Sequence, residues 1–440
     1  MLFNDLRGVS WTANSEASVQ RLFEAITGYF TFRSNTLSAV DELLDEDPDC
    51  PMGWVLRGYL LLFARSAALV TDARVAYVKA DALARGATPR EQLHIAALKA
   101  WTDADTLNAQ ILWSNIISDT PHDLLALRVQ HFNAIFLGCP HQLAKLAGRT
   151  LVDWNDDVPG AGFAWSTACM GLEEVGQFTK AERIGRRGAE LEPDDLWAVH
   201  SVAHVMEAEG RLDDGLEWMK RPDSFWQGRG PMRHHLWWHE ALFLYEAGDY
   251  ERVLDYYDAR IALKERSSYM EMSNASSLLL RLESSGVSCG ERWDSLAKES
   301  LHLIDSRVLT FSDVHLLFIY GMASDGESFR RLTQSILNYS EVGTYDADAA
   351  GRISMPLAGV FEARAAQDYN LATDMLFDAR ADFVRMGGSN AQRDALDIFL
   401  VDCAIAAGKT GMARNLIEEY LNVRPESIPM REQLANIENA

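Results

Sequence analysis

The chain has 440 residues, 48% of them hydrophobic and 24% charged, which is the balance of an ordinary globular protein. Its 64 acidic residues outnumber its 41 basic residues, and the formal net charge is −23 at pH 7. Such a surface repels phosphate groups, so the composition argues against nucleic acid and against an anionic membrane as partners.

The five cysteines are widely spaced and include no Cys-x-x-Cys pair, which indicates reduced thiols rather than a disulfide framework or a thiolate zinc site. The first residues lack a basic stretch leading into an apolar one, so no signal peptide is expected. The longest apolar segment, Trp54 to Val70, contains Arg57 and Arg65 and predicts a core helix rather than a membrane span. We therefore expect a cytoplasmic protein without membrane contact.

Helical periodicity with short connectors runs along the whole chain, and strand signals are nearly absent. Two weak helical repeats come first, over residues 90–121 and 124–157. The clearest repeat follows at 162–195, with Gly176 in its turn and Pro193 closing its second helix. Its length and its small residues resemble the 34-residue tetratricopeptide repeat.

Three further segments fit the same frame, with glycine at the turn position: 196–229, 234–267 and 394–427. Residues 264–338 and the link 386–393 fit it poorly, although their flanks still read as helical. Each repeat in such an array packs on its neighbours, so we predict one all-α domain over residues 1–440. We expect a tetratricopeptide-like superhelix, an α-solenoid of roughly a dozen helix pairs.

Two histidine pairs stand out, because residues four apart on a helix share one face. In tetratricopeptide repeats the first helix lines the concave surface. The register places histidines or an aspartate on that face at the following positions: His94, His200, His204, His235, His239 and Asp313. The concave surface is therefore the expected site, closed enough to form a pocket.

Five segments resemble one family over nearly the whole chain: REQLHIAAL from Arg90, AVHSVAHVMEAEG from Ala198, HHLWWHEALFLYEAGDYE from His234, FSDVHLL from Phe311 and GGSNAQRD from Gly387. They are similar to the tetratricopeptide repeat protein 38 family of bacteria and animals. The resemblance implies the helical-repeat architecture and no reaction. It implies these site residues: His94, His200, His204, His235, His239, Asp313, His315, Asn390 and Arg393.

A metal site is one interpretation of the four paired histidines. Neutral imidazole suits zinc, copper, nickel or iron, and Asp313 could complete or orient the ligand set. An open coordination position would activate water, as in a hydrolase or lyase. Against this, the chain has no His-Glu-x-x-His motif, and none of the four paired histidines lies three residues after a glutamate, as a Glu-x-x-His motif requires.

A metal-free pocket is the second interpretation, in which the histidines act as acids, bases or hydrogen-bonding groups. Arg393 would pair an anionic group and Asn390 would orient it. Trp238 would form an aromatic wall, since Trp237 and Trp238 diverge by about 100° and cannot both face a groove. Ser389 is expected to cap the helix that begins near Asn390.

A peptide groove and a purely structural role remain open as well. The lysine, asparagine and arginine clamp for a peptide carboxylate is not matched here. A structural role requires partners for every buried imidazole, because an unpaired donor costs about 1–3 kcal/mol. We predict a protein that binds a small molecule or peptide in a histidine-rich pocket, with an enzyme using the same residues as the alternative. The sequence leaves open which ligand binds, whether the protein catalyses a reaction, whether a metal is present and whether the chain forms a homodimer.

Overall fold

The structure is a computed structural model that describes residues 1–262 and 268–439. Residues 263–267, which end the expected repeat 234–267 and begin the divergent region 264–338, lie outside the described residues. By their contacts the described residues form two units. Unit 1 comprises residues 1–135, 140–202 and 221–232, and unit 2 comprises residues 136–139, 203–220 and 233–440. The boundary passes through helix α11, Leu196–Ala208.

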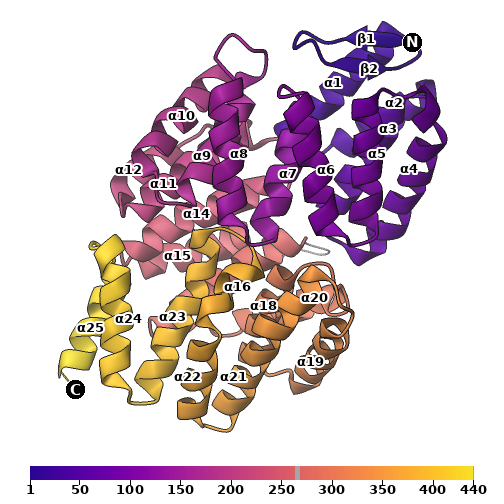
Figure 1. Cartoon of the computed structure of the whole chain (residues 1–440). Coiled ribbons are helices and arrows are strands. Elements are labelled where there is room, and N and C mark those ends of the chain that lie inside the picture. The colour runs from indigo at the N-terminus through magenta and orange to yellow at the C-terminus, as the bar shows by residue number, and fades with distance from the viewer. Residues whose placement is uncertain (263–267, 440) are drawn as a thin grey trace. The chain divides into compact units, whose positions relative to one another are not determined.

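Unit 1 begins with a short antiparallel hairpin, followed by consecutive helices with short connectors (Figure 1). Its strands and helices are β1 Leu2–Asn4, β2 Ser10–Thr12, α1 Glu16–Phe30, α2 Thr36–Glu46, α3 Pro51–Phe63, α4 Val70–Ala82, α5 Pro89–Thr102, α6 Thr106–Asp119, α7 Leu124–Phe136, α8 Pro140–Asp153, α9 Ala161–Glu173, α10 Phe178–Leu191 and α13 Asp223–Trp226. The sequence did not predict the hairpin. Its turn is held by Asp5, whose carboxylate accepts from the backbone N–H groups of Arg7 and Val9.

Unit 2 continues the same pattern of consecutive helices. Its helices are α12 Leu212–Met219, α14 Met232–Glu246, α15 Tyr250–Tyr256, α16 Tyr269–Ser284, α17 Arg292–Ser300, α18 Thr310–Met322, α19 Gly326–Ser340, α20 Tyr345–Ala349, α21 Met355–Ala365, α22 Tyr369–Asp378, α23 Asn390–Ala406, α24 Thr410–Val423 and α25 Ile428–Asn439. The described residues thus hold 25 α-helices, in agreement with the predicted dozen pairs. The divergent region is helical over most of its described length.

The clearest predicted repeat is the pair α9 and α10. Gly176 ends the turn after α9 with φ +75°, a left-handed conformation that favours glycine. The two backbones touch, because a Cβ on Gly188 would lie 2.9 Å from the carbonyl oxygen of Gly162. Ala181 is fully buried where the helices meet. The all-α, tetratricopeptide-like arrangement is therefore confirmed.

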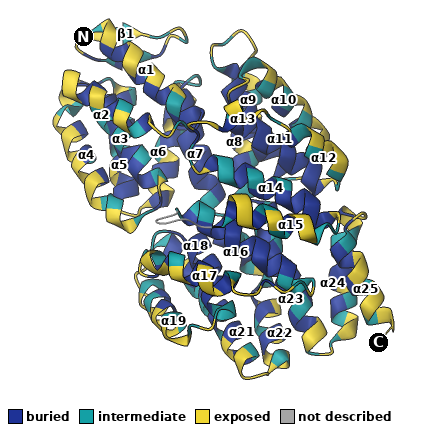
Figure 2. Ribbon diagram, turned by 180° about the vertical axis from the view of Figure 1, so that it is seen from behind, coloured by how far each residue is buried: buried dark blue, intermediate teal, exposed yellow. Residues whose placement is uncertain are grey.

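First helices and second helices of a pair differ in burial (Figure 2). Every residue of α9 is buried, whereas its partner α10 buries only one stripe. Likewise α18 is buried over nearly all its length, whereas α19 buries only Leu332 and Ile336. Polar side chains on the first helices therefore lie in the interior and need partners there.

A single continuous domain over residues 1–440 stays a prediction. Among the residues described, none of the helices combines the length and the apolar character needed to cross a membrane.

Candidate functional site

The four predicted histidines meet. His200 and His204 stand one turn apart on α11, and His235 and His239 stand one turn apart on α14. One ligand atom from each of the four lies within 4.8 Å of the others, and all four side chains are buried. This set of four is called the histidine cluster below. The sequence predicted a pocket on the concave surface, and in the structure all four imidazoles are buried.

Three imidazoles of the cluster lie within unit 2 alone. The ring of His239 meets the ring of His204 edge-on with centroids 4.4 Å apart, and the ring of His235 with centroids 4.8 Å apart. The indole of Trp238 stacks on His235 at 5.2 Å and 13°. Trp238, predicted to form the wall of a ligand pocket, therefore packs against a cluster histidine.

Two of these histidines are held by hydrogen bonds at Nδ1. His239 donates from Nδ1 to the Glu207 carboxylate at 2.9 Å, and His235 donates from Nδ1 to Oδ1 of Asn274 at 2.9 Å. When the Glu207 carboxyl is ionised, both partners are acceptors at the atom concerned, and the proton then resides on Nδ1 in each ring. The Nε2 atoms of His235 and His239 consequently carry the lone pairs.

The surroundings keep these rings neutral. Burial lowers the pKa of His235 to about 3, with a further contribution from His239. Burial also lowers the pKa of His239 to about 3, helped by the positive charge of Arg281. The pKa of His204 falls well below its usual value through burial and through His239. Neutral imidazole is the form that binds transition metals.

Glu207 was missed by the sequence analysis, although a signal was present. Counting from residue 196, it occupies position 12 of its repeat, a concave position. Burial raises its pKa to about 7, and the charges of Arg424 and Arg281 oppose that rise. Glu207 therefore belongs to the site as the carboxylate that orients His239.

Helix α16 supplies two residues that lay in the region the repeat frame did not fit. Asn274 and Arg281 are seven residues apart on one buried, polar stripe of this helix. Arg281 donates from Nη1 to the carbonyl oxygen of Ser277 at 3.1 Å and from Nη2 to that of Ala391 at 2.6 Å. A run of buried small and polar residues within an otherwise apolar helix was the available signal.

Asn390 and Arg393 lie in the first turn of α23. Nη2 of Arg393 donates to Oδ1 of Asn390 at 2.5 Å, and the charge of Arg393 contributes to the lowered pKa of His204. Arg393 is thus brought within electrostatic reach of the histidine cluster. Ser389 is the N-cap residue, and its backbone N–H donates to the Gln392 side chain at 2.9 Å.

The two predicted residues on α18 lie outside the group of four. Asp313 forms an ion pair with Arg307, and burial raises its pKa to about 7. His315 donates from Nδ1 to the carbonyl oxygen of Phe311 at 2.7 Å, and burial lowers its pKa to about 4. Neither side chain is among the four convergent ligand residues.

His94 has its partners within unit 1, on and around α5. It is fully buried, and its ring nitrogens contact the hydroxyl of Tyr59 at 3.1 Å and the carboxylate of Asp123 at 3.0 Å. Burial opposes ionisation of Asp123, but His94 and Arg90 outweigh it and lower the pKa of that carboxyl. The polar surroundings of His94 are those of a hydrogen-bonded core residue.

No family model matches the chain. Solved structures with a related helical architecture include the APC/C hetero-tetramer Cut9–Hcn1, at 13% identity and a TM-score of 0.44, covering 88% of this chain. This chain spans 63% of that one, less than two thirds of its length. A human IFIT1 dimer with PPP-AAAA matches at 10% identity and a TM-score of 0.41, covering 98% of this chain and 96% of its own. Yeast Tom70 matches at 10% identity and a TM-score of 0.36, covering 96% and 87%.

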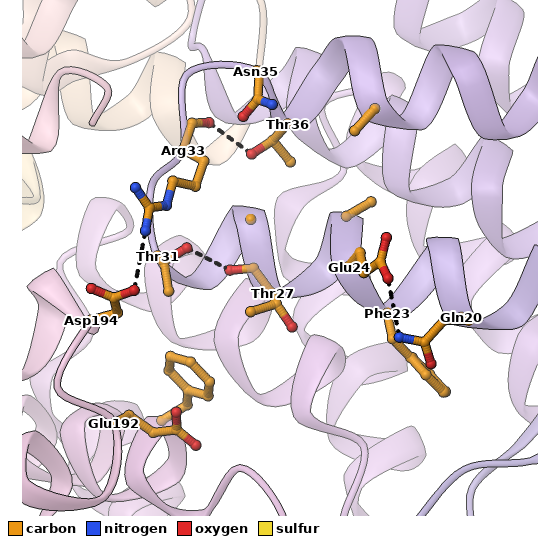
Figure 3. A pocket seen from close by; sticks show the side chains of 14 residues that line it. Gln20, Phe23, Glu24, Thr27, Thr31, Arg33, Asn35, Thr36, Glu192 and Asp194 are labelled. Atoms are coloured by element: carbon orange, nitrogen blue, oxygen red, sulfur yellow. Dashed lines mark hydrogen bonds and ion pairs between the residues drawn. The ribbon is translucent and has the colours of Figure 1, made fainter. Parts of the chain in front are cut away.

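A separate surface pocket of about 540 Å³ lies in unit 1 (Figure 3). Arg33 pairs with Asp194 at 3.1 Å at one end, and the Gln20 amide donates to Glu24 at 3.1 Å at the other. Side chains of Phe23, Phe163 and Glu192 are shared with an adjoining pocket of about 330 Å³. None of the predicted site residues lines either pocket.

Proposed function

We propose that this protein is a cytosolic repeat protein that binds one divalent transition-metal ion through His204, His235 and His239, with His200 as the fourth donor. The observation that carries the proposal is the convergence of four ligand atoms to within 4.8 Å. Zinc–imidazole bonds of about 2.0–2.1 Å require such convergence. A chance group of buried histidines has no reason to bring all its ligand atoms together.

The hydrogen bonds at Nδ1 support the same proposal. Histidines that ligate metals usually donate their other ring N–H to a carboxylate or an amide oxygen, which fixes the ring and its tautomer. Glu207 and Asn274 do this for His239 and His235. In that tautomer Nε2 is the atom through which each ring would bind a metal.

A small molecule is the ligand that suits this centre, because the four histidines are buried and a long peptide has no access to them. A metal held by His204, His235 and His239 keeps a fourth position, which either His200 or, in its place, water or a ligand atom would occupy. Metal-assisted hydrolysis or elimination is the enzymatic form of the proposal, since such a metal lowers the pKa of its bound water.

Membership of the tetratricopeptide repeat protein 38 family is part of the proposal. Two of the five similar segments, residues 198–210 and 234–251, contain the four cluster histidines. A third, residues 387–394, contains Asn390 and Arg393. The distinctive part of the resemblance therefore coincides with the proposed site.

Elemental analysis of protein purified without a histidine tag or chelator tests the metal. We expect about one metal ion per chain, lost in the His204→Ala/His239→Ala variant. His131→Leu removes a buried histidine of unit 1 outside the cluster and is the matched control, expected to keep the metal. Thermal unfolding must show that each variant is folded. A wild-type protein that stays metal-free after dialysis against zinc and cobalt salts would refute the proposal.

A further inference from the structure

We infer that a buried oxyanion site, built on Arg281, lies beside the histidine cluster and holds a carboxylate or phosphate group of the ligand. The inference deepens the proposed function, since it assigns the chemical class of the molecule that the metal centre receives. It stands on the surroundings of Arg281 in unit 2, a residue that neither the repeat frame nor the resemblance indicated.

Arg281 is a buried cation that forms no close ion pair among the described residues, although the Glu207 carboxylate lies within its electrostatic reach. Its side chain is 2% exposed, and its guanidinium hydrogen bonds go to two neutral carbonyl oxygens, those of Ser277 and Ala391. Among the described residues, Arg281 forms no ion pair, unlike Arg364 and Arg424. Buried charges are costly unless they are paired, so a counter-ion is expected here.

The nearby carboxylates are engaged elsewhere. Glu207 accepts from His239, Glu246 accepts from the Tyr420 hydroxyl at 2.7 Å, and Asp394 pairs with Arg424 at 2.6 Å. None of these acids forms an ion pair with Arg281, and Glu207 acts on it only through longer-range electrostatics. A bound metal cation would increase the local positive charge further and strengthen the demand for an anion.

Arg281 lies next to the cluster rather than in a remote part of the core. Its guanidinium sits 5.6 Å over the ring of Trp238, and that ring stacks on His235. Its charge contributes to the low pKa of His239 and of His315. An oxyanion bound to Arg281 is thus within reach of a metal held by the same histidines.

The first turn of α23 adds to the attraction for an anion. Arg281 is tied to this turn through the carbonyl oxygen of Ala391, and Arg393 stands in the same turn. The positive end of a helix dipole favours negative charge at such a turn. The Arg281 guanidinium therefore lies at the N-terminal turn of a 17-residue helix.

Calorimetric titration with inorganic phosphate and with acetate tests the inference, using both metal-free and cobalt-loaded protein. We expect one of the two probes to bind, and Arg281→Gln to weaken that binding by about tenfold or more without changing the metal content. The probe that binds more tightly identifies the source as phosphate or carboxylate. Arg281→Lys keeps the positive charge. Anion binding retained in this variant would show that the loss in Arg281→Gln arises from the missing charge and not from misfolding.

Arg364→Gln is the matched control, because Arg364 also lies over an aromatic ring in unit 2 but pairs with Asp402. It should leave anion binding unchanged. Equal affinity in wild type and Arg281→Gln, or binding of neither probe, would overturn the inference. If the metal is absent but the metal-free protein binds an anion through Arg281, the proposed metal fails and this inference stands.

Discussion

Acid should destabilise this protein through its buried histidines, and His315 allows the effect to be worked out. Its pKa is about 4 in the folded protein, because burial disfavours the charged ring, and 6.5 in the unfolded chain. The unfolded chain therefore takes up the proton first. Stability contributed by the neutral ring is fully present above pH 6.5 and is lost as the pH falls toward 4.

The loss at pH 5 follows from these two values. At that pH the unfolded imidazole is almost wholly protonated, whereas the folded one is mostly neutral. Because the unfolded chain binds the proton more tightly, the free energy of unfolding falls by about 2 kcal/mol between pH 7.5 and pH 5. Replacing His315 by leucine removes this pH-dependent part. It also removes the hydrogen bond to Phe311, which lowers stability by about 1 kcal/mol at both pH values.

Chemical denaturation at pH 7.5 and pH 5 measures the effect as the difference between the two unfolding free energies. We expect this difference to be about 2 kcal/mol smaller in His315→Leu than in wild type. Phe318→Leu, a non-titrating change against the same ring, is the control and should lower stability equally at both pH values. An unchanged pH difference in His315→Leu would show that the ring is protonated, or exposed, in the folded state.

Asn274→Leu removes the hydrogen bond that orients His235, so metal affinity measured against a competing chelator should fall roughly tenfold to a hundredfold; unchanged affinity would exclude an orienting role. Gly388→Ala should lower the unfolding free energy by about 1–3 kcal/mol, because the backbone has φ +79° and the new Cβ would lie 2.7 Å from the Phe311 ring; a neutral result in thermal unfolding would contradict that geometry. In the native protein a thiol reagent should label Cys139 alone, since the other four cysteines are buried; rapid labelling of more than one thiol, detected by mass spectrometry, would refute this.

The repeat frame and the shared helix face of each histidine pair could be predicted, because both depend on local helix geometry. A spacing of four residues places His200 with His204, and His235 with His239, whatever the helices pack against. Turn glycines such as Gly176 mark where each first helix ends. These features need no knowledge of contacts distant in sequence.

The partners of the histidines could not be predicted in the same way. Asn274 lies 39 residues beyond His235, and Arg281 meets Ala391 across 110 residues. Such contacts depend on how irregular helices of the divergent region pack, which no repeat register specifies. The N-terminal hairpin was missed for a different reason, since its three-residue strands are too short for a period-two pattern.

Burial of the cluster changes what its chemistry can be. On an open concave surface, water would satisfy the imidazoles and four histidines would need no further explanation. In the interior each ring needs partners, and Asn274 and Glu207 contact Nδ1 of His235 and His239. The same interior contains Arg281, whose guanidinium donates to two carbonyl oxygens and forms no close ion pair with a described carboxylate. Convergent histidines support the proposal of a metal, and a buried arginine without a close ion pair supports the proposal of an anionic ligand, so the two proposals rest on separate observations.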